Sequence, residues 1–177
     1  MTNLHTLLDQ LAIPFKPDSI TWKPSVIKGD KCLALAYADL RAYQERLDEL
    51  CGLDWSVRYV AWGDDRIMCE LTICHVTRTS TGEMDVQDEK NGMGGTVAEA
   101  QAFKRACAMF GLGRYLYELP SLWVGYDAST KKISKAGLET LDQRYHSWYE
   151  RKLAALAKEH ANATATENRN GDMKIAA

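Results

Sequence analysis

One stretch, residues 92–117, constrains the fold more than any other part of the chain. It passes from a glycine-rich segment into an alanine-rich run, which ends at Gly111 and Gly113 and is followed by an aromatic segment. Thr96 and Glu99 stand three residues apart, which is the spacing of a capping box, so we expect a helix to begin at Thr96. Gly111 is the expected end of that helix.

The predicted helix has two different sides. At 100° per residue, its apolar side holds Phe103, Ala106, Cys107 and Phe110. The opposite side holds Gln101, Lys104, Arg105 and Ala108. Small neighbours let a polyanion approach two adjacent cations, which offer it charge and hydrogen bonds. The alternative is an ordinary solvated face, because charge pairs on surfaces are common.

Upstream of this helix, apolar alternation predicts an antiparallel meander. The expected strands are residues 54–61, 66–79 and 84–89, with turns at 63–65 and 80–83. Short turns between neighbouring strands imply antiparallel pairing. The expected fold class is therefore α+β, with a β-β-β-α core in which Phe103 and Phe110 place the helix across the sheet.

Further elements should flank this core. We expect helices at residues 2–11, 33–51 and 137–156, an extended segment at 20–24 and an irregular aromatic segment at 119–124. The apolar stripe of the last helix, with Tyr145 and Trp148, fits a core or a subunit contact. Residues 161–177 carry few large apolar groups, so we expect a single domain over residues 1–160 and a disordered tail after it.

Composition limits the possible partners. The formal net charge is −2 and the isoelectric point is about 6.1, so nucleic-acid binding would need a local basic strip on an acidic surface. No run of residues is long and apolar enough for a membrane span, and the first residues lack the features of a signal peptide. A cytoplasmic location without membrane partners is expected.

The cysteines and histidines do not form a recognisable reactive site. Five cysteines is an odd number, and reduced, buried thiols are the default in a cytosolic protein. Strand alternation would place Cys74 and His75 on opposite faces, and no CxxC pair exists, so no metal site is expected. The histidines have no nucleophile context, which leaves no catalytic residue.

The string AFKRACAMFGLGRYLYELP resembles the signature of the Rad52 superfamily of single-strand annealing proteins, in its bacterial and phage branch (DdrA-like or Sak-like). The segment YADLRAYQERLDELCGLDW resembles a second block of that family, and Trp22-Lys23-Pro24 resembles a DdrA-type feature. The resemblance covers roughly residues 21–126. Ala108 departs from it, because animal members carry further cations on this helix.

The resemblance implies a non-enzymatic protein without cofactor. Such a protein binds single-stranded DNA in a groove around a homo-oligomeric ring and anneals complementary strands without ATP, in recombination or double-strand-break repair. The implied DNA-binding residues are Arg41, Lys104, Arg105, Arg114 and Tyr37. Tyr37 and Arg41 are four residues apart on the expected helix, so Arg41 would contact a phosphate beside the face of Tyr37. A helical pair between Arg41 and Glu45 is the alternative. Further candidate partners are a single-strand-binding protein and an exonuclease.

The sequence is also compatible with two other function classes. Asp88-Glu89-Lys90 fits half of a magnesium-dependent nuclease motif, to which Asp64 or Asp65 could add a second carboxylate. A β-β-β-α core with a basic helix also occurs in RNA- and duplex-binding modules. The glycines at 92–95 match neither common nucleotide-binding motif and are better explained as a strand-to-helix connection.

Overall fold

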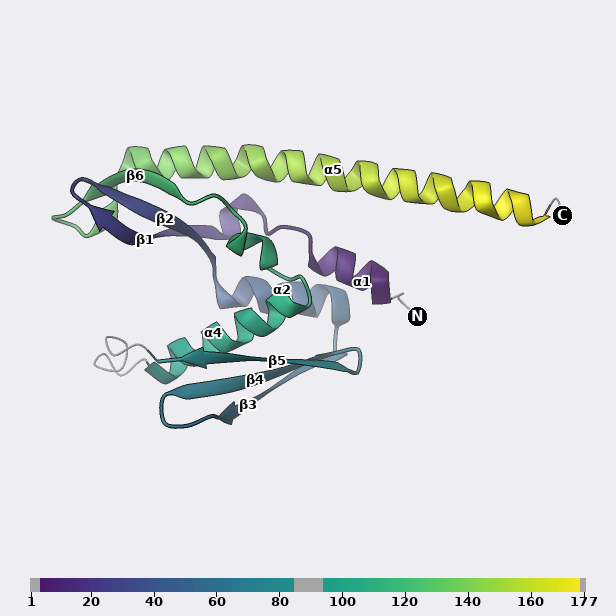
Figure 1. Cartoon of the computed structure of the whole chain (residues 1–177), viewed down its shortest axis with the longest axis horizontal. Helices are drawn as coiled ribbons and strands as arrows, with labels where there is room; N and C mark the ends of the chain where they lie inside the picture. Colours follow the sequence, from purple (N-terminus) through teal and green to yellow (C-terminus); the bar gives the residue numbers. More distant parts are fainter. Residues whose placement is uncertain (1–3, 85–93, 176–177) are drawn as a thin grey trace.

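The computed structural model describes residues 4–84 and 94–175. Figure 1 shows two antiparallel sheets with helices α2 (Leu40–Cys51) and α4 (Gly94–Met109) between them. The long helix α5 (Lys135–Ile175) covers the upper sheet on its outer side. The short elements are α1 (Leu4–Leu11) and the 3-10 helices η1 (Pro17–Ser19) and η2 (Arg114–Tyr117). The α+β class expected from the sequence is confirmed.

The lower sheet is the expected meander, with different strand boundaries. Its strands are β3 (Trp55–Ala61), β4 (Arg66–Ile73) and β5 (Val76–Glu83), paired in that order. The single strand expected over residues 66–79 is wrong, because the chain reverses at Cys74 and His75. Both residues have positive φ, 47° and 70°, as a two-residue hairpin turn needs. The turn expected at 80–83 is therefore strand, and the strand expected at 84–89 lies, apart from Met84, outside the described residues.

Helix α4 packs on the inner face of this sheet through the predicted apolar side. Phe103 and Cys107 are fully buried against Cys69 and Leu71 of β4. The helix begins at Gly94, so the start expected at Thr96 is about half a turn late. Gly111, with φ of 95°, lies just beyond its end as expected.

The upper sheet was not expected from the sequence. Its strands are β1 (Ile20–Lys28), β2 (Lys31–Ala38), β6 (Leu122–Asp127) and β7 (Lys132–Ile133), in the order β1-β2-β6-β7. The helix expected over 33–51 is wrong up to residue 38, and the irregular segment at 119–124 is wrong from residue 122. A short apolar run fits a strand as well as a helix. Asp39 marks the true start of α2, because its side chain accepts a hydrogen bond from the backbone N of Arg41.

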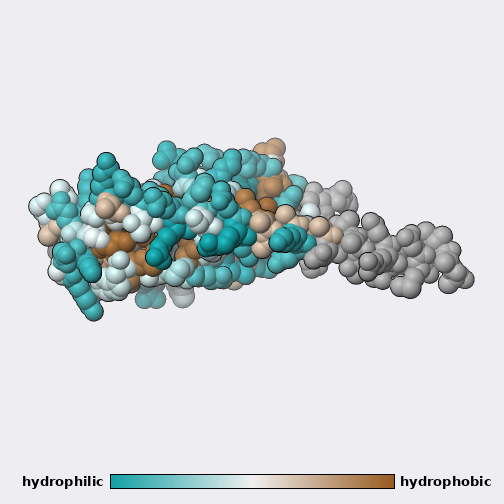
Figure 2. All heavy atoms as spheres, turned by 90° about the horizontal axis from the view of Figure 1, so that it is seen from above, coloured by the Kyte–Doolittle hydropathy of each residue, from teal (hydrophilic) through white to brown (hydrophobic). Residues whose placement is uncertain are grey.

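Helix α5 is held to the body by buried aromatic residues. The Tyr145 hydroxyl donates to Phe15 O at 2.8 Å and lies 2.9 Å from the Tyr115 hydroxyl, which accepts from Phe15 N. Trp148 stacks on Tyr115 with ring centroids 5.3 Å apart. The stripe of Tyr145 and Trp148 is therefore core of this chain and not a free subunit contact. Seen from above, the outer surface is mostly hydrophilic (Figure 2).

Helix α5 also continues through residues 161–175, where the sequence predicts a tail without regular structure. The division into a domain at 1–160 and a separate tail stays a prediction. We expect removal of residues 161–177 to leave the melting temperature nearly unchanged, because this segment has few large apolar groups to bury. A large drop in the melting temperature of the shortened chain, measured by circular dichroism, would show that the segment stabilises the fold.

A second prediction concerns the contact between β5 and α4. A Cβ atom on Gly82 would overlap Ala98 O and lie 2.7 Å from Ala102 N, both in the backbone of α4. We expect Gly82→Ala to lower the free energy of unfolding by ~1–3 kcal/mol or more, since neither backbone can move aside locally. The control is Gly95→Ala, whose Cβ meets nothing within 4 Å. Urea denaturation that gives both variants the parent's stability would contradict this packing.

Candidate nucleic-acid interface

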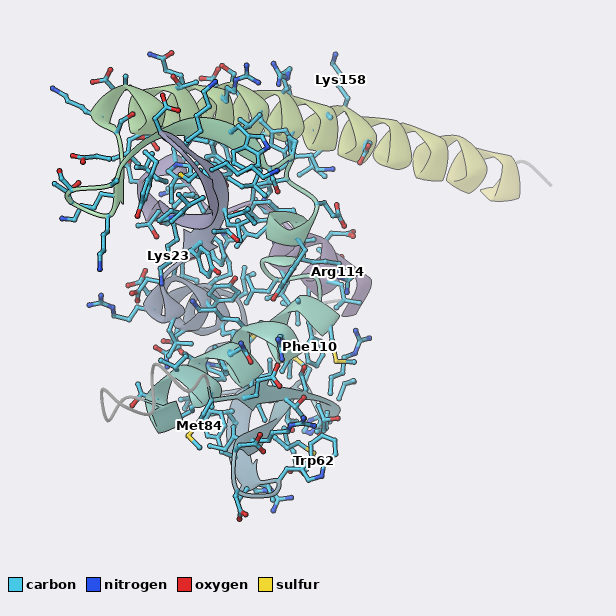
Figure 3. All side chains as sticks on the ribbon, turned by 60° about the vertical axis from the view of Figure 1, so that its left-hand side comes forward. Lys23, Trp62, Met84, Phe110, Arg114 and Lys158 are labelled. Atoms are coloured by element: carbon cyan, nitrogen blue, oxygen red, sulfur yellow. The ribbon has the colours of Figure 1, made fainter. Side chains whose placement is uncertain are left out.

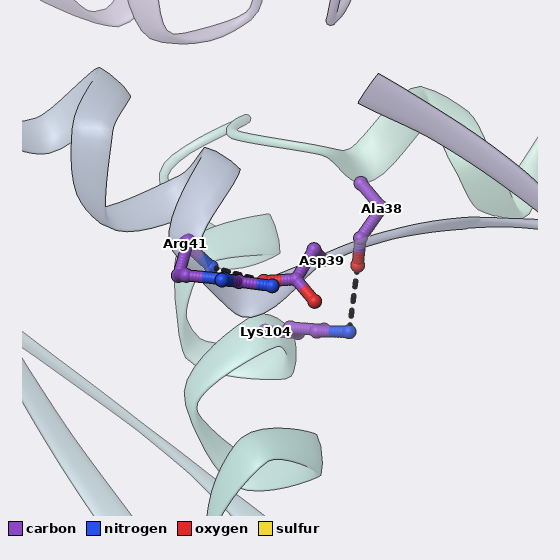
Figure 4. A network of polar contacts seen from close by, with 4 residues as sticks. All are labelled: Ala38, Asp39, Arg41 and Lys104. Atoms are coloured by element: carbon purple, nitrogen blue, oxygen red, sulfur yellow. Dashed lines mark hydrogen bonds and ion pairs between the residues drawn. The ribbon is translucent and has the colours of Figure 1, made fainter. Parts of the chain in front are cut away.

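Lys104 joins α4 to the upper sheet. Its Nζ donates to Ala38 O, at the end of β2, over 2.7 Å (Figure 4). The side chain is partly buried, and this burial lowers the pKa of its amine. The nearby charge of Lys23 lowers the pKa further, whereas Asp39 opposes the shift. A bound anion would stabilise the charged form of Lys104.

Arg41 lies beside this contact and is paired with Asp39. Its Nε is 2.8 Å from Asp39 Oδ1, and the Arg41 side chain is 80% exposed. The hydrogen bond from the Arg41 side chain is the main reason that the pKa of Asp39 falls from 3.8 to about 2. The helical pair with Glu45 considered above does not form among the ion pairs of the described residues. Such an exposed pair is weak, so Arg41 can exchange its partner.

Tyr37 lies on β2 and not on the helix of Arg41, so the expected i, i+4 contact between them is wrong. Instead, Nζ of Lys23 lies 4.8 Å from the centroid of the Tyr37 ring, across the β1–β2 pair. Lys23 did not enter the predicted site. The available signal was its place in the extended Trp22-Lys23-Pro24 segment. Without the strand pairing, that signal does not show on which face of the sheet the side chain lies.

Arg105 ties α4 to the lower sheet, on the other side from Lys104. One of its Nη atoms donates to Thr81 O at 2.9 Å. Arg105 also lies near Tyr117, which is 68% exposed. Partial desolvation of its phenol raises the pKa of Tyr117, and the positive charge of Arg105 opposes this shift. The two adjacent cations are thus partly buried connectors and not a freely solvated pair. A guanidinium has five N–H donors, so Arg105 can hold Thr81 and an anion together.

Arg114 is separated from the other predicted residues. Its guanidinium donates to Ala108 O at 2.7 Å and to Met109 O at 2.9 Å, at the C-terminal end of α4. Figure 3 shows Arg114 and Lys23 on opposite sides of the molecule. The guanidinium satisfies carbonyl groups at the end of a helix, which is a structural role.

Four cations therefore surround the junction of the two sheets, and we call them the junction strip: Lys23, Arg41, Lys104 and Arg105. They come from β1, α2 and α4, and the neighbouring carboxylate of Asp39 is already paired. Lysine and arginine donors at several points along a surface can follow a chain of phosphates without reading its bases.

The described residues give no support for metal chemistry. None of them form a group of three or more His, Cys, Asp or Glu side chains that could hold a metal ion. The nuclease-like segment Asp88-Glu89-Lys90 lies outside the described residues. Oδ1 of Asp65 lies 3.9 Å from Nε of Arg66, with which it forms an ion pair. Cys74 and His75 occupy a turn, so the expectation that they face opposite sides of a strand is wrong.

None of the described helices is both long enough and apolar enough to cross a membrane.

Comparison with known proteins gives three relatives. The single-stranded DNA-binding protein DdrA of Deinococcus radiodurans is 37% identical over 129 residues, which are 70% of this chain and 61% of that protein. DdrA of Deinococcus deserti is 37% identical over 139 residues, 74% of this chain and 67% of that protein. The mitochondrial DNA repair RAD52-like protein 1 of Arabidopsis thaliana is 39% identical over 79 residues, 39% of this chain and 45% of that protein. No family model and no solved structure matches the chain.

The pairing of Asp39 with Arg41 predicts a pH effect. Because the folded pKa of Asp39 is lowered, its contribution to stability is complete above about pH 4 and is lost as the pH falls toward 2. Arg41→Ala should raise the pKa of Asp39 toward 3.8, but not fully, since the backbone N of residue 41 still donates to it. NMR titration of the carboxyl carbon measures this, with Arg58→Ala on the lower sheet as the control. An unchanged pKa in Arg41→Ala would contradict the ion pair.

Proposed function

The chain belongs to the DdrA-like branch of the Rad52 superfamily, and on that premise we propose that it binds single-stranded DNA along the junction strip and anneals complementary strands without ATP. This activity would serve the repair and recombination of DNA in the cytoplasm. Both DdrA relatives are named as single-stranded DNA-binding proteins. This chain spans 61% and 67% of their lengths, so their activity comes to it as part of the proposal.

The observation that carries the proposal is the position of Lys104. Its amine is partly buried at the junction of two sheets, with a second lysine near enough to lower its pKa. One carbonyl oxygen, Ala38 O, accepts from this amine, which has three donors. Burial of a charge is costly unless it is paired, so an anion that completes the pairing would be stabilised there.

Contacts to phosphates suit annealing. A strand held by its backbone leaves its base edges available for a complementary strand. Pairing of the two strands is favourable by itself, so the protein needs only to hold and align them, without a nucleotide cofactor or a catalytic residue. Because the contacts go to the backbone, they do not compete with base pairing, and the free energy of duplex formation drives the annealing.

Assembly into a ring would strengthen weak contacts. Each chain carries a net charge of −2 and a small number of cations at the junction, which is little for tight binding. Linking many such sites on one strand raises the overall affinity through effective concentration. In the described sheets β3 and β5 are terminal strands, whose unpaired backbone groups another copy could bind. A single-strand-binding protein or an exonuclease would supply the DNA.

The main prediction is a loss of affinity at the junction strip. Lys104→Ala and Arg105→Ala should each weaken binding of a labelled single strand, by a similar factor for different sequences, because phosphates carry no sequence information. Each should also lower the log–log salt slope by roughly 0.7, the value for one phosphate contact on single-stranded DNA. Fluorescence anisotropy across a salt series measures both quantities.

Three controls separate binding from folding. Lys104→Arg keeps the charge and should restore most of the affinity, whereas Lys152→Ala on α5 should change nothing. Melting curves show whether each variant is folded. If folded Lys104→Ala and Arg105→Ala both bind like the parent at every salt concentration, the strip has only a structural role. Cleavage of the strand in the presence of magnesium would favour the nuclease class, and preference for a duplex would favour the duplex-binding class.

Assembly gives a separate prediction. The native particle should have a mass many times that of one chain, which is 19.9 kDa. Light scattering at micromolar concentration measures this mass, and a closed ring predicts one discrete value that does not grow with concentration. A stable particle with the mass of one chain would exclude the ring.

A further inference from the structure

The upper sheet has one face that α5 does not cover. Cys32, Ala34 and Val124 are buried together with Leu141 of α5, so they point toward that helix. Side chains alternate along a strand, so Leu33 of β2 points the opposite way, and Trp123, its direct partner on β6, does the same. Trp123 is 45% exposed, which is unusual for so large an apolar group.

An irregularity in β1 brings two lysines to this open face. Lys23 pairs with Leu35 and Lys28 pairs with Lys31, and both partners share the face of Leu33. Lys23 and Lys28 are five residues apart, so a regular strand would place them on opposite faces. The register shift between Pro24 and Ile27 adds one residue to β1 and places both lysines on the same side.

Each of these lysines lies over an exposed aromatic ring. Nζ of Lys23 is 4.8 Å from the centroid of Tyr37, and Nζ of Lys28 is 5.4 Å from the centroid of Trp123. Leu33 and Leu35 lie between the two pairs and are only partly buried. We call this surface the open-face platform: Tyr37, Trp123, Lys23 and Lys28. In Figure 3, Lys23 lies between the upper sheet and the helices below it, on the side away from α5.

The charge of the platform limits its ligand. Neither β1 nor β2 contains an aspartate or a glutamate, whereas the two strands together carry three lysines. Asp127, at the end of β6, binds Ser129 and Thr130 of its own loop. The platform also continues into the junction strip, because Lys104 binds Ala38, the residue after Tyr37. A ligand must therefore be anionic, have flat apolar groups, and be able to extend from the junction strip.

We propose that the open-face platform binds unpaired bases of the single strand. Lys28 and Lys23 turn away from the rings of Trp123 and Tyr37 to contact the phosphates, and the two rings stack on separate bases. This inference rests on the proposed function and adds base contacts to a strip that holds only phosphates. Along β2 the two aromatic positions are about 13 Å apart, at ~3.3 Å per residue. Stacking tolerates any base, so the platform selects single strands without selecting a sequence.

The test compares two probes of equal length: a labelled oligothymidylate and the same sugar–phosphate chain without bases. Trp123→Ala should bind the oligothymidylate roughly 5- to 150-fold more weakly than the parent, which is the loss of one stacked base. Its affinity for the abasic chain and its salt slope should equal those of the parent. Trp123→Phe should restore most of the affinity, because it keeps an aromatic face.

Trp62→Ala is the matched control, since Trp62 is 56% exposed at the far end of the lower sheet (Figure 3). If Trp123→Ala melts below the parent, Trp123→Leu replaces it, because leucine keeps apolar bulk without an aromatic face. An equal loss on both probes, parent-like affinity in the folded variants, or a smaller native particle would overturn the platform. The last result would mean that a second copy covers Trp123. A parent that binds neither probe would instead refute the proposed function itself.

Discussion

The close contact of α4 with β5 fixes the position of Lys104 and Arg105, the two cations that α4 brings to the proposed site. Gly82 lets the backbone of the helix approach the strand more closely than any side chain would allow, and Phe103 and Cys107 fill the core on the same side. With the helix held there, Lys104 and Arg105 emerge at its flanks. One reaches Ala38 O of the upper sheet and the other reaches Thr81 O of the lower sheet. The two cations therefore join the halves of the molecule before any ligand is present.

This arrangement reconciles a basic site with an acidic chain. The net charge is −2, so long-range attraction of a polyanion is weak, and binding depends on where the cations lie. Partial burial lowers the pKa of Lys104 and makes its charge more dependent on a partner. Asp39 pairs with Arg41 at the edge of the site and keeps that guanidinium near α2. In the proposed site, a phosphate would compete with Asp39 for Arg41, so the carboxylate would limit the affinity for DNA.

The sequence predicted those parts of the fold that local patterns determine. The apolar side of α4 and the meander could be derived, because periodicity reports which face is buried. The upper sheet could not, since residues 33–38 fit a strand or a helix equally, and β2 pairs through Leu33 and Ala34 with β6, about ninety residues away. The turn at Cys74 and His75 lacks the glycine or asparagine that usually signals a hairpin. Lys23 was missed because the upper sheet, which positions it, was not predicted. Arg114 was included from the family motif, although its guanidinium donates to carbonyl groups at the end of α4.

The most direct test of the junction strip is the affinity of Asp39→Asn for a single strand, measured by anisotropy across a salt series. Asparagine keeps the helix cap but removes the charge that holds Arg41. We expect tighter binding than the parent and a salt slope steeper by roughly 0.7, as one more cation contacts the strand. Glu159→Gln on α5 makes the same change in net charge and should leave both quantities unchanged. Equal or weaker binding by folded Asp39→Asn would show that Arg41 has no part in holding DNA, which contradicts the proposed junction strip.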